Sequence, residues 1–279
     1  CGTSFTTTPL PQIDNISAIV TDPGVDLNWL VDPKINKPDY SLFRSIGGSI
    51  YLPFAKAADK KFTDADYTTA GAYCYRVDYI DACGNFSPAG IPTCPIRLAG
   101  TLLDNNIVTL SWSKFNGWKD GVKNYVVDRY STTGSLINSI NMDLDTTYSE
   151  DPDPKIQSIR YRIRAISTTT GLTASLSNIV EIAKKTNIYT PTAFTPNQDK
   201  LNDTFTVSGY YISKISLMIF DRWGALVYTS DKSEAWNGTK SETGQLMPEG
   251  SYIWKANVTD LSGKNFSEEG TVFLIRKGN

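Results

Sequence analysis

The feature that most constrains this chain is a repeated alternation of apolar and polar residues over short segments. Residues 25–29, 75–79 and 108–112 each carry apolar side chains at every second position, and Gly, Pro, Asn and Asp separate such segments. Because successive side chains of a strand point to opposite faces, this pattern is typical of antiparallel sheets with one buried face. Long amphipathic helical patterns are missing from the sequence. The alternation therefore predicts an all-β fold built from antiparallel sandwiches.

Composition narrows the functions that are open to the chain. The 279 residues include 27 basic and 29 acidic ones, and the net charge of −2 gives no reason to expect a nucleic acid or an anionic membrane as partner. The sequence has no histidine, which excludes Ser-His-Asp and Cys-His pairs and zinc sites that need imidazole. No apolar run approaches the roughly 20 residues of a membrane-spanning segment. Carboxylate chemistry stays open, but no pair of carboxylates is recognisable, so we expect no enzyme activity.

The first two thirds of the chain contain an internal repeat. Its paired segments are 27–29 with 110–112, 40–44 with 125–129, and 75–77 with 161–163. A Trp on the second strand, a Tyr-rich third strand and a Tyr-x-Val-type later strand resemble the fibronectin type III fold. We therefore expect three tandem immunoglobulin-like or fibronectin III-like β-sandwiches, at residues 1–97, 98–185 and 186–279. In the first two, Trp29 and Trp112 are interpreted as core residues, because the alternation turns them inward.

Four cysteines lie in the first third of the chain, and none has the paired spacing of a metal site. Even-numbered cysteines in a β-rich chain favour disulfides and an oxidising compartment. The fibronectin-like resemblance implies that residues 72–81 and 89–97 are the last two strands of the first sandwich, which pairs Cys74 with Cys94. It also implies a Cys1–Cys83 bridge. We interpret Cys1 as a cut within a longer polypeptide, and a lipid-bearing N-terminal Cys is the alternative.

The last ninety or so residues carry several ordered motifs. They are Thr-Pro-Asn at 195–197, Phe-Asp-Arg-Trp-Gly at 220–224, Trp-Asn-Gly at 236–238, Pro-Glu-Gly-Ser-Tyr at 248–252 and a closing strand at 270–276. In this order they resemble the gliding-motility-associated C-terminal domain, the type B sorting signal of the type IX secretion system of Bacteroidetes-type bacteria. The residues that match its motifs are Phe194, Thr195, Pro196, Asn197, Asp203, Phe220, Asp221, Arg222, Trp223, Gly224, Trp236, Gly238, Gly250, Tyr252, Gly270, Leu274 and Arg276.

One loop departs from the family pattern. Gln198 and Lys200 stand where the family usually has glycine, which puts a glycine-dependent backbone conformation in doubt. The loop is rich in oxygen ligands, and calcium prefers such ligands. Asx residues also stabilise turns without any cation, so both interpretations stay open. The candidate calcium ligands are Asn197, Asp199, Asn202 and Asp203.

Two further features of the tail have a structural and a functional interpretation. Arg222 and Trp223 can form a stacked cation–aromatic pair, or they can contribute to the surface that the export machinery reads. The terminal strand, residues 272–276, can close the sandwich, or it can pair with a receptor through an exposed edge.

The resemblance implies export across the outer membrane to the cell surface or the medium. The implied partner is the type IX machinery, with an outer-membrane β-barrel of the PorP/SprF kind. We expect the C-terminal region of a large gliding-motility adhesin of the SprB kind, with two stalk modules before the sorting domain. The alternative is the sorting region of a secreted hydrolase whose catalytic domain lies upstream. A third hypothesis gives the modules a glycan ligand.

Overall fold

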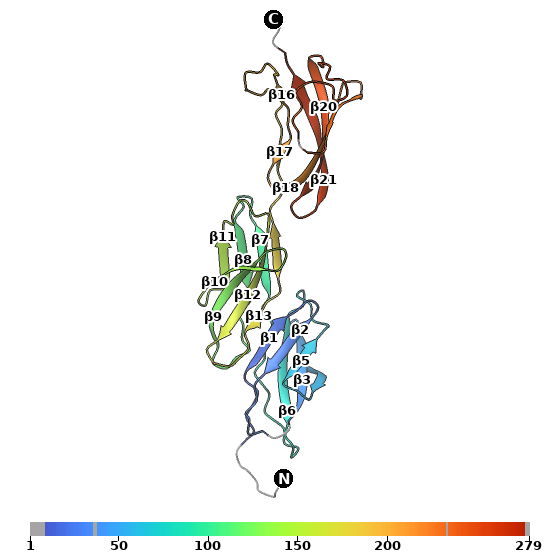
Figure 1. Ribbon diagram of the computed structural model, residues 1–279. Coiled ribbons are helices and arrows are strands. Elements are labelled where there is room, and N and C mark those ends of the chain that lie inside the picture. The colour runs from blue at the N-terminus through green and yellow to red at the C-terminus, as the bar shows by residue number, and fades with distance from the viewer. Residues whose placement is uncertain (1–8, 36–37, 233, 277–279) are drawn as a thin grey trace. The chain divides into compact units, whose positions relative to one another are not determined.

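A computed structural model describes residues 9–35, 38–232 and 234–276 (Figure 1). The described residues form 21 strands and no helix, which confirms the all-β prediction. The chain divides into two compact units. The first unit comprises residues 1–152 and 159–182, and the second comprises residues 153–158 and 183–279. The boundaries predicted at residues 97 and 185 stay predictions.

The first sandwich lies within the first unit. Its strands are β1 (Ile16–Val20), β2 (Val25–Trp29), β3 (Asp39–Ile46), β4 (Leu52–Ala57), β5 (Lys61–Asp64) and β6 (Tyr73–Ile80). One layer has the order β1-β2-β5 and the other the order β4-β3-β6. Alternate residues of β2 and β6 are buried, as the sequence pattern requires. Trp29 is buried and meets Tyr40 edge-on, with ring centroids 5.1 Å apart, which confirms it as a core residue.

The second sandwich repeats this plan. Its strands are β7 (Leu98–Leu102), β8 (Val108–Trp112), β9 (Val122–Tyr130), β10 (Leu136–Asn141), β11 (Thr147–Glu150), β12 (Ser158–Ser167), β13 (Ser175–Leu176) and β14 (Val180–Ala183). One layer has the order β11-β8-β7, and β10, β9, β12 and β13 follow one another in the other. Trp112 is buried against Tyr125 at 6.0 Å, as Trp29 is against Tyr40. The internal repeat in the sequence is therefore a repeat of the core.

A parallel pairing joins the two sandwiches within the first unit. Ile19 of β1 is in register with Leu176 of β13, so one sheet runs through both sandwiches. Around this pairing, the Ser17 hydroxyl donates to the carbonyl of Thr173 at 2.6 Å and accepts from Trp118 Nε1 at 3.1 Å. The two sandwiches are therefore joined by backbone and side-chain hydrogen bonds and are not independent modules.

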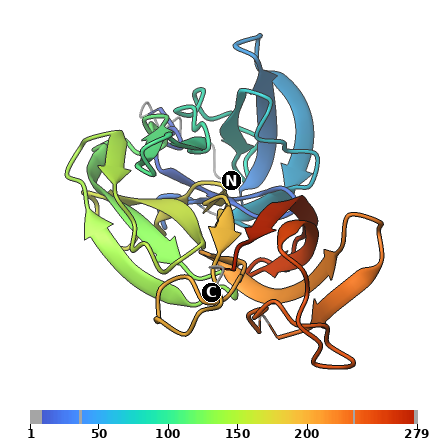
Figure 2. The ribbon, with the colours of Figure 1, turned by 90° about the horizontal axis from the view of Figure 1, so that it is seen from above.

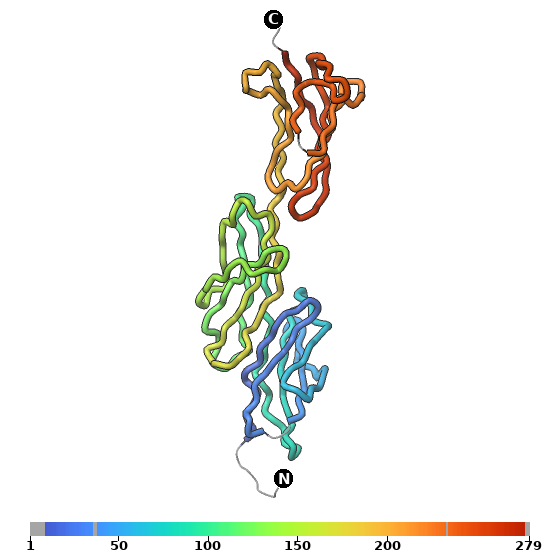
Figure 3. Tube along the Cα trace, viewed as in Figure 1, coloured from blue at the N-terminus to red at the C-terminus, as the bar shows by residue number. Residues whose placement is uncertain are grey.

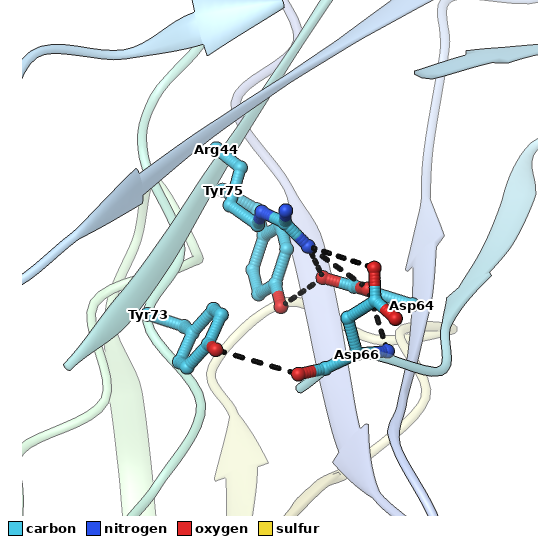
Figure 4. A network of polar contacts seen from close by, with 5 residues as sticks. All are labelled: Arg44, Asp64, Asp66, Tyr73 and Tyr75. Atoms are coloured by element: carbon cyan, nitrogen blue, oxygen red, sulfur yellow. Dashed lines mark hydrogen bonds and ion pairs between the residues drawn. The ribbon is translucent and has the colours of Figure 1, made fainter. Parts of the chain in front are cut away.

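A buried polar triad ties the two layers of the first sandwich together (Figure 4). Asp64 of β5 is buried and forms an ion pair with Arg44 of β3, with Nη1 2.9 Å from Oδ2. Tyr75 of β6 donates its hydroxyl proton to the same carboxylate at 2.7 Å. Burial raises the pKa of Tyr75, and its hydrogen bond to Asp64 raises it further, so the phenol stays protonated.

The second sandwich holds the same triad at the equivalent positions. Glu150 of β11 accepts from the Tyr161 hydroxyl at 2.6 Å and forms an ion pair with Arg129 Nε at 3.2 Å. Burial raises the pKa of Tyr161, and Glu150 adds to this effect. In both sandwiches one carboxylate on one layer thus meets an arginine and a tyrosine on the other.

The predicted bridge between Cys74 and Cys94 is present, with a Cα–Cα distance of 4.2 Å. The predicted Cys1–Cys83 bridge involves residue 1, which lies outside the described residues. The strand predicted at residues 89–97 is wrong: this segment makes only a single bridge, between Tyr75 and Thr93. Prolines at 88, 92 and 95 explain the difference, because a proline cannot donate to a strand ladder.

The second unit contains a third sandwich. Its strands are β15 (Ile188–Tyr189), β16 (Ala193–Phe194), β17 (Ser208–Gly209), β18 (Ile212–Phe220), β19 (Leu226–Ser230), β20 (Gly250–Asp260) and β21 (Asn265–Leu274). The main sheet has the order β16-β21-β20-β18-β19, and β15 pairs with β17. The orange and red strands of this sheet are seen from above in Figure 2, and Figure 3 traces β20 and β21 as one long hairpin.

We predict that Tyr75→Phe lowers the free energy of unfolding of the first unit by about 2 kcal/mol, because it removes a buried hydrogen bond to a charged group. Chemical denaturation followed by tryptophan fluorescence measures the change. The matched control is Tyr73→Phe, which removes only a 3.3 Å exposed hydrogen bond to the carbonyl of Asp66 and should change stability by less than about 0.5 kcal/mol. Equal effects of the two variants would show that the triad contributes no more to the free energy of unfolding than an exposed hydrogen bond does.

Candidate functional site

The aromatic motif residues of the second unit form the centre of its core. Trp236 is completely buried, with the ring of Phe194 5.2 Å away and the ring of Tyr252 4.8 Å away. Trp236 Nε1 donates to the carbonyl of Thr239 at 2.8 Å, so the buried indole is satisfied. Leu274 of the closing strand is buried in the same core. These motif residues therefore specify the fold of the unit, and a partner cannot reach them from outside.

The motif glycines meet specific conformational or spatial needs. Gly224 has a φ of 81° in the tight turn after β18, where Asp221 Oδ1 accepts from the backbone of Trp223 and Ala225, both at 2.9 Å. At Gly270, an added Cβ would come within 2.8 Å of the Trp254 ring. These positions explain why the motif needs glycine.

Arg276 fastens the end of the closing strand to the turns beside it. Its backbone N–H donates to Glu249 at 2.8 Å, and its guanidinium donates to the carbonyls of Met247 and Gly238 at 3.3 and 3.0 Å. Gly238 and Arg276 are thus in contact although 38 residues separate them, and Gly250 pairs with Leu274, two residues before Arg276.

The loop at 195–203 is organised around the carboxylate of Asp203. Its oxygens accept from the backbone N–H groups of Asn197, Gln198 and Lys200 at 3.0, 2.7 and 2.8 Å. Gln198 and Lys200 have φ values of 66° and 69°, so the loop keeps the left-handed backbone that glycine would favour. The doubt raised by the two replaced glycines is thereby resolved: the conformation survives, held by Asp203.

The four candidate calcium ligands lie in this one loop, but their contacts are mostly with one another and with the backbone. Asn197 Nδ2 donates to Asp199 Oδ2 at 2.8 Å, and Asp199 Oδ1 accepts from the backbone of Leu201 at 2.8 Å. The described residues contain no cluster of three or more His, Cys, Asp or Glu side chains suited to a metal. Calcium binding stays a prediction, and Asp203 already has a structural role without it.

Arg222 stacks over the ring of Trp223, with its Cζ 5.0 Å from the ring centroid. This is the contact that the structural interpretation predicts. The Trp223 side chain is nevertheless 81% exposed, so the pair also presents a large aromatic surface to solvent. Stacking and recognition are therefore compatible at this position.

The terminal strand closes the main sheet. β21 pairs with β20 along its whole length and with β16 at Phe273 and Leu274. In the described part of the chain, no strand pairs with the other edge of β21 between Asn265 and Thr271. This edge carries Glu268 and Glu269, and charged residues discourage unwanted strand addition.

An exposed row of apolar side chains crosses the outer face of the main sheet. Phe220 of β18 is in register with Leu226 of β19 and with Ile253 of β20. Phe273 of β21 lies on the same face, because it alternates with buried Val272 and Leu274. Leu226, Ile253 and Phe273 are each about half exposed. We call Phe220, Leu226, Ile253 and Phe273 the outer apolar row.

The row was missed in the sequence, although a signal for it exists. At 217–220, 252–254 and 272–275, apolar residues occupy positions of both parities, whereas a strand with one solvated face should alternate. The additional apolar residues lie on the outer face of the sheet. Exposed apolar patches commonly mark interaction surfaces, so this face is a candidate contact surface.

Asp260 is a buried carboxylate at the end of β20 that sequence reasoning also missed. Burial alone would raise its pKa, but hydrogen bonds from Ser262, Gln157 and the backbone of Lys264 outweigh this effect and lower the pKa to about 2. Gln157 Nε2 lies 2.9 Å from Oδ2. Asp260 thereby attaches the segment 153–158 to the tail of the same unit.

Comparison with known proteins identifies the second unit. Residues 188–274 match the family model described as the CHU_C Type IX secretion signal domain. These residues are a type IX secretion signal domain. The protein is therefore exported to the cell surface or the extracellular medium and interacts with the type IX secretion machinery. The matched residues include every strand from β15 through β21, and therefore the whole main sheet and the β15–β17 pair.

Other comparisons add little. The search of the curated proteins finds no match. Among solved structures, a tetra-tandem repeat in the extending region of a large adhesion protein matches with 13% identity over 93% of this chain and 73% of that one, at a TM-score of 0.33. A chicken interferon gamma receptor alpha chain matches with 10% identity over 62% and 98%, at 0.27. No helix that could cross a membrane occurs in the described residues.

We predict that Gln198→Gly stabilises the second unit by about 0.5 kcal/mol, because it relieves a left-handed residue whose cost exceeds the added chain entropy of glycine. Lys200→Gly should act in the same direction. Thermal unfolding measures both, with Gln198→Ala as the control that keeps the strain and gains nothing. A loss of stability in both glycine variants would show that residues 198 and 200 are not strained by a left-handed backbone.

The second unit should also lose stability in acid. The folded pKa of Asp260 is depressed, so its contribution is fully present above about pH 4 and disappears as the pH falls toward about 2, a loss of about 2 kcal/mol. Native-state hydrogen exchange of the β20 core amides measures this loss. Asp260→Asn should be less stable at neutral pH and should show a smaller change over that interval.

Proposed function

We propose that this chain is the C-terminal region of a secreted cell-surface adhesin, in which the first unit serves as part of a stalk and the second as the export signal. The observation that supports the export role most directly is the signal domain at residues 188–274, which has a hydrophobic core of its own. The stalk role is supported by the repeated sandwiches, their shared sheet and the Cys74–Cys94 disulfide, all of which stiffen the first unit.

The outer apolar row is the proposed contact with the secretion machinery, whose receptor we infer to be an outer-membrane β-barrel of the PorP/SprF kind. The motif residues in the core fix the shape of the sheet, whereas the row is the part of it that a partner can reach. Trp223, beyond the end of β18, extends the same hydrophobic character, since aromatic side chains are frequent centres of recognition.

The proposal includes no catalytic role for these residues. The two ion pairs that bridge sandwich layers, Arg44 with Asp64 and Arg129 with Glu150, have carboxylates that already accept hydrogen bonds from tyrosine hydroxyls. Their chemistry supports stability. An upstream catalytic domain, as in a secreted hydrolase, would be compatible with the same signal and the same contacts.

Export can be tested with a reporter protein fused ahead of residues 1–279 in a host with a cognate type IX machinery. The reporter should reach the surface or the medium, and Ile253→Ser combined with Phe273→Ser should reduce export at least about fivefold, because hot-spot side chains carry most of the energy of an interface. Protease accessibility on whole cells gives the readout.

The matched control is Leu246→Ser combined with Leu261→Ser, which removes two exposed leucines of the same unit that lie outside the outer apolar row. This pair should export normally, and the melting temperatures of both variants should match that of the parent. Retention of the parent fusion in the periplasm would defeat the export role, and equal loss in both pairs would defeat the role of the row.

A further inference from the structure

A cleft of about 670 Å³ opens in the first unit beside the pairing of β1 with β13. Its walls are the end of β1 with the turn that follows it, at residues 19–24, two connecting segments at residues 67–69 and 178–179, and Arg162 of β12. A second hollow of about 460 Å³ shares Thr69 and Asn178 with it and adds Arg97. The first volume lies in the range of pockets that hold small ligands.

Arg162 is placed at this cleft by β12 and has no carboxylate partner. Its Nε donates to the carbonyl of Ser177 at 3.0 Å and its Nη2 to the carbonyl of Val20. Among the described residues no ion pair involves Arg162, and Asp128, the carboxylate that influences it, is bonded to Arg164 and Ser139. Burial lowers the pKa of Arg162, so its positive charge is poorly compensated.

Arg97 adds a second positive charge. Its side chain is exposed and forms no ion pair within the described part of the chain. It acts electrostatically on Tyr67, which is one of the residues that line the main cleft. The one carboxylate in the walls, that of Asp22, lies exposed and is not ion-paired with Arg162. The two hollows together are therefore a place where an anion is favoured.

The remaining walls suit a compact polar ligand better than a peptide. The lining includes three residues with side-chain hydroxyls, Thr21, Thr68 and Thr69, and the hydroxyl of Thr21 donates to the carbonyl of Pro23 at 3.0 Å. Asn178 is held rigidly, because it accepts from the backbone of Leu98 at 2.8 Å and donates to its carbonyl at 2.9 Å. A peptide that adds a strand needs an open strand edge, and β1, the strand that reaches the cleft, is already paired with β2 and with β13.

We propose that this cleft binds an acidic saccharide, with the sugar carboxylate at Arg162, the ring hydroxyls at the threonine side chains and an extension toward Arg97. This inference goes beyond the stalk role proposed for the first unit, because it gives that unit a ligand of its own, and it rests on the proposal that the chain belongs to an adhesin. It does not depend on export, because purified protein serves as the test.

The test begins with the purified chain on an array of oligosaccharides that contain glucuronate, galacturonate or sialate, each beside its neutral parent. At least one acidic probe should bind, and its neutral parent should bind at least about tenfold more weakly, the equivalent of one charge-assisted hydrogen bond. Absence of binding across the acidic probes would overturn the proposal, and so would equal binding of acidic and neutral members.

Variants then locate the site with the probe that binds. Arg162→Gln should weaken binding at least about tenfold and Arg97→Gln about threefold. The matched control is Arg160→Gln, on the same strand with the same loss of charge but outside the cleft, and it should leave affinity within about twofold. Because Arg162 also holds Val20, Thr68→Trp supplies an independent block that fills the cleft without touching the arginine.

Binding that survives both Arg162→Gln and Thr68→Trp would place the ligand elsewhere and refute the site. Melting curves of all four variants accompany the affinities. Normal export of a chain that binds no glycan would leave the sorting role intact, and glycan binding by a chain that is not exported would leave this site intact. The experiments therefore test the export role and the saccharide site independently of each other.

Discussion

The structure of the first unit depends on a carboxylate buried between two sheet layers. Sandwich layers are held mainly by apolar burial, which has no direction and permits sliding. Asp64 and Glu150 add a fixed point, because each meets an arginine and a tyrosine of the opposite layer. A buried charge without its partners would be strongly destabilising, so each triad favours the register that brings its three side chains together. The neighbouring Trp–Tyr pairs then fill the space that this register defines.

Local pattern was enough to predict the all-β fold and the core tryptophans, and the fibronectin-like resemblance predicted the Cys74–Cys94 bridge. It could not predict the triads, because the repeat contains the arginine and tyrosine, whereas the carboxylates come from β5 and β11 and are recognisable only once the layers face each other. The strand that the fibronectin-like resemblance implied at 89–97 does not form, because prolines in and beside this segment cannot donate to a strand ladder. The role of Asp260 was also not predictable from local pattern, because its partner Gln157 is 103 residues away in the sequence.

In the second unit, the sequence motif and the accessible surface are largely different sets of residues. Phe194, Trp236 and Tyr252 are visible in the sequence because the fold requires them, but they lie inside. Leu226 and Ile253 lie outside and belong to no motif. A sorting signal that is recognised as a folded domain needs both sets: buried residues that form the sheet, and exposed residues that the secretion machinery can contact. The loop around Asp203 shows the same division, since its backbone is preserved while two of its side chains have changed.

The pairing of Ile19 with Leu176 has a consequence for the order in which the chain can mature. Synthesis proceeds from the N-terminus, so β1 and β2 are available long before β13 leaves the ribosome or crosses the inner membrane. During that interval the outer edge of β1 is uncovered, and an uncovered edge invites pairing with a neighbouring molecule. The leading repeat therefore completes its sheet only when its successor arrives, and a chaperone that shields strand edges would have its natural client in this intermediate.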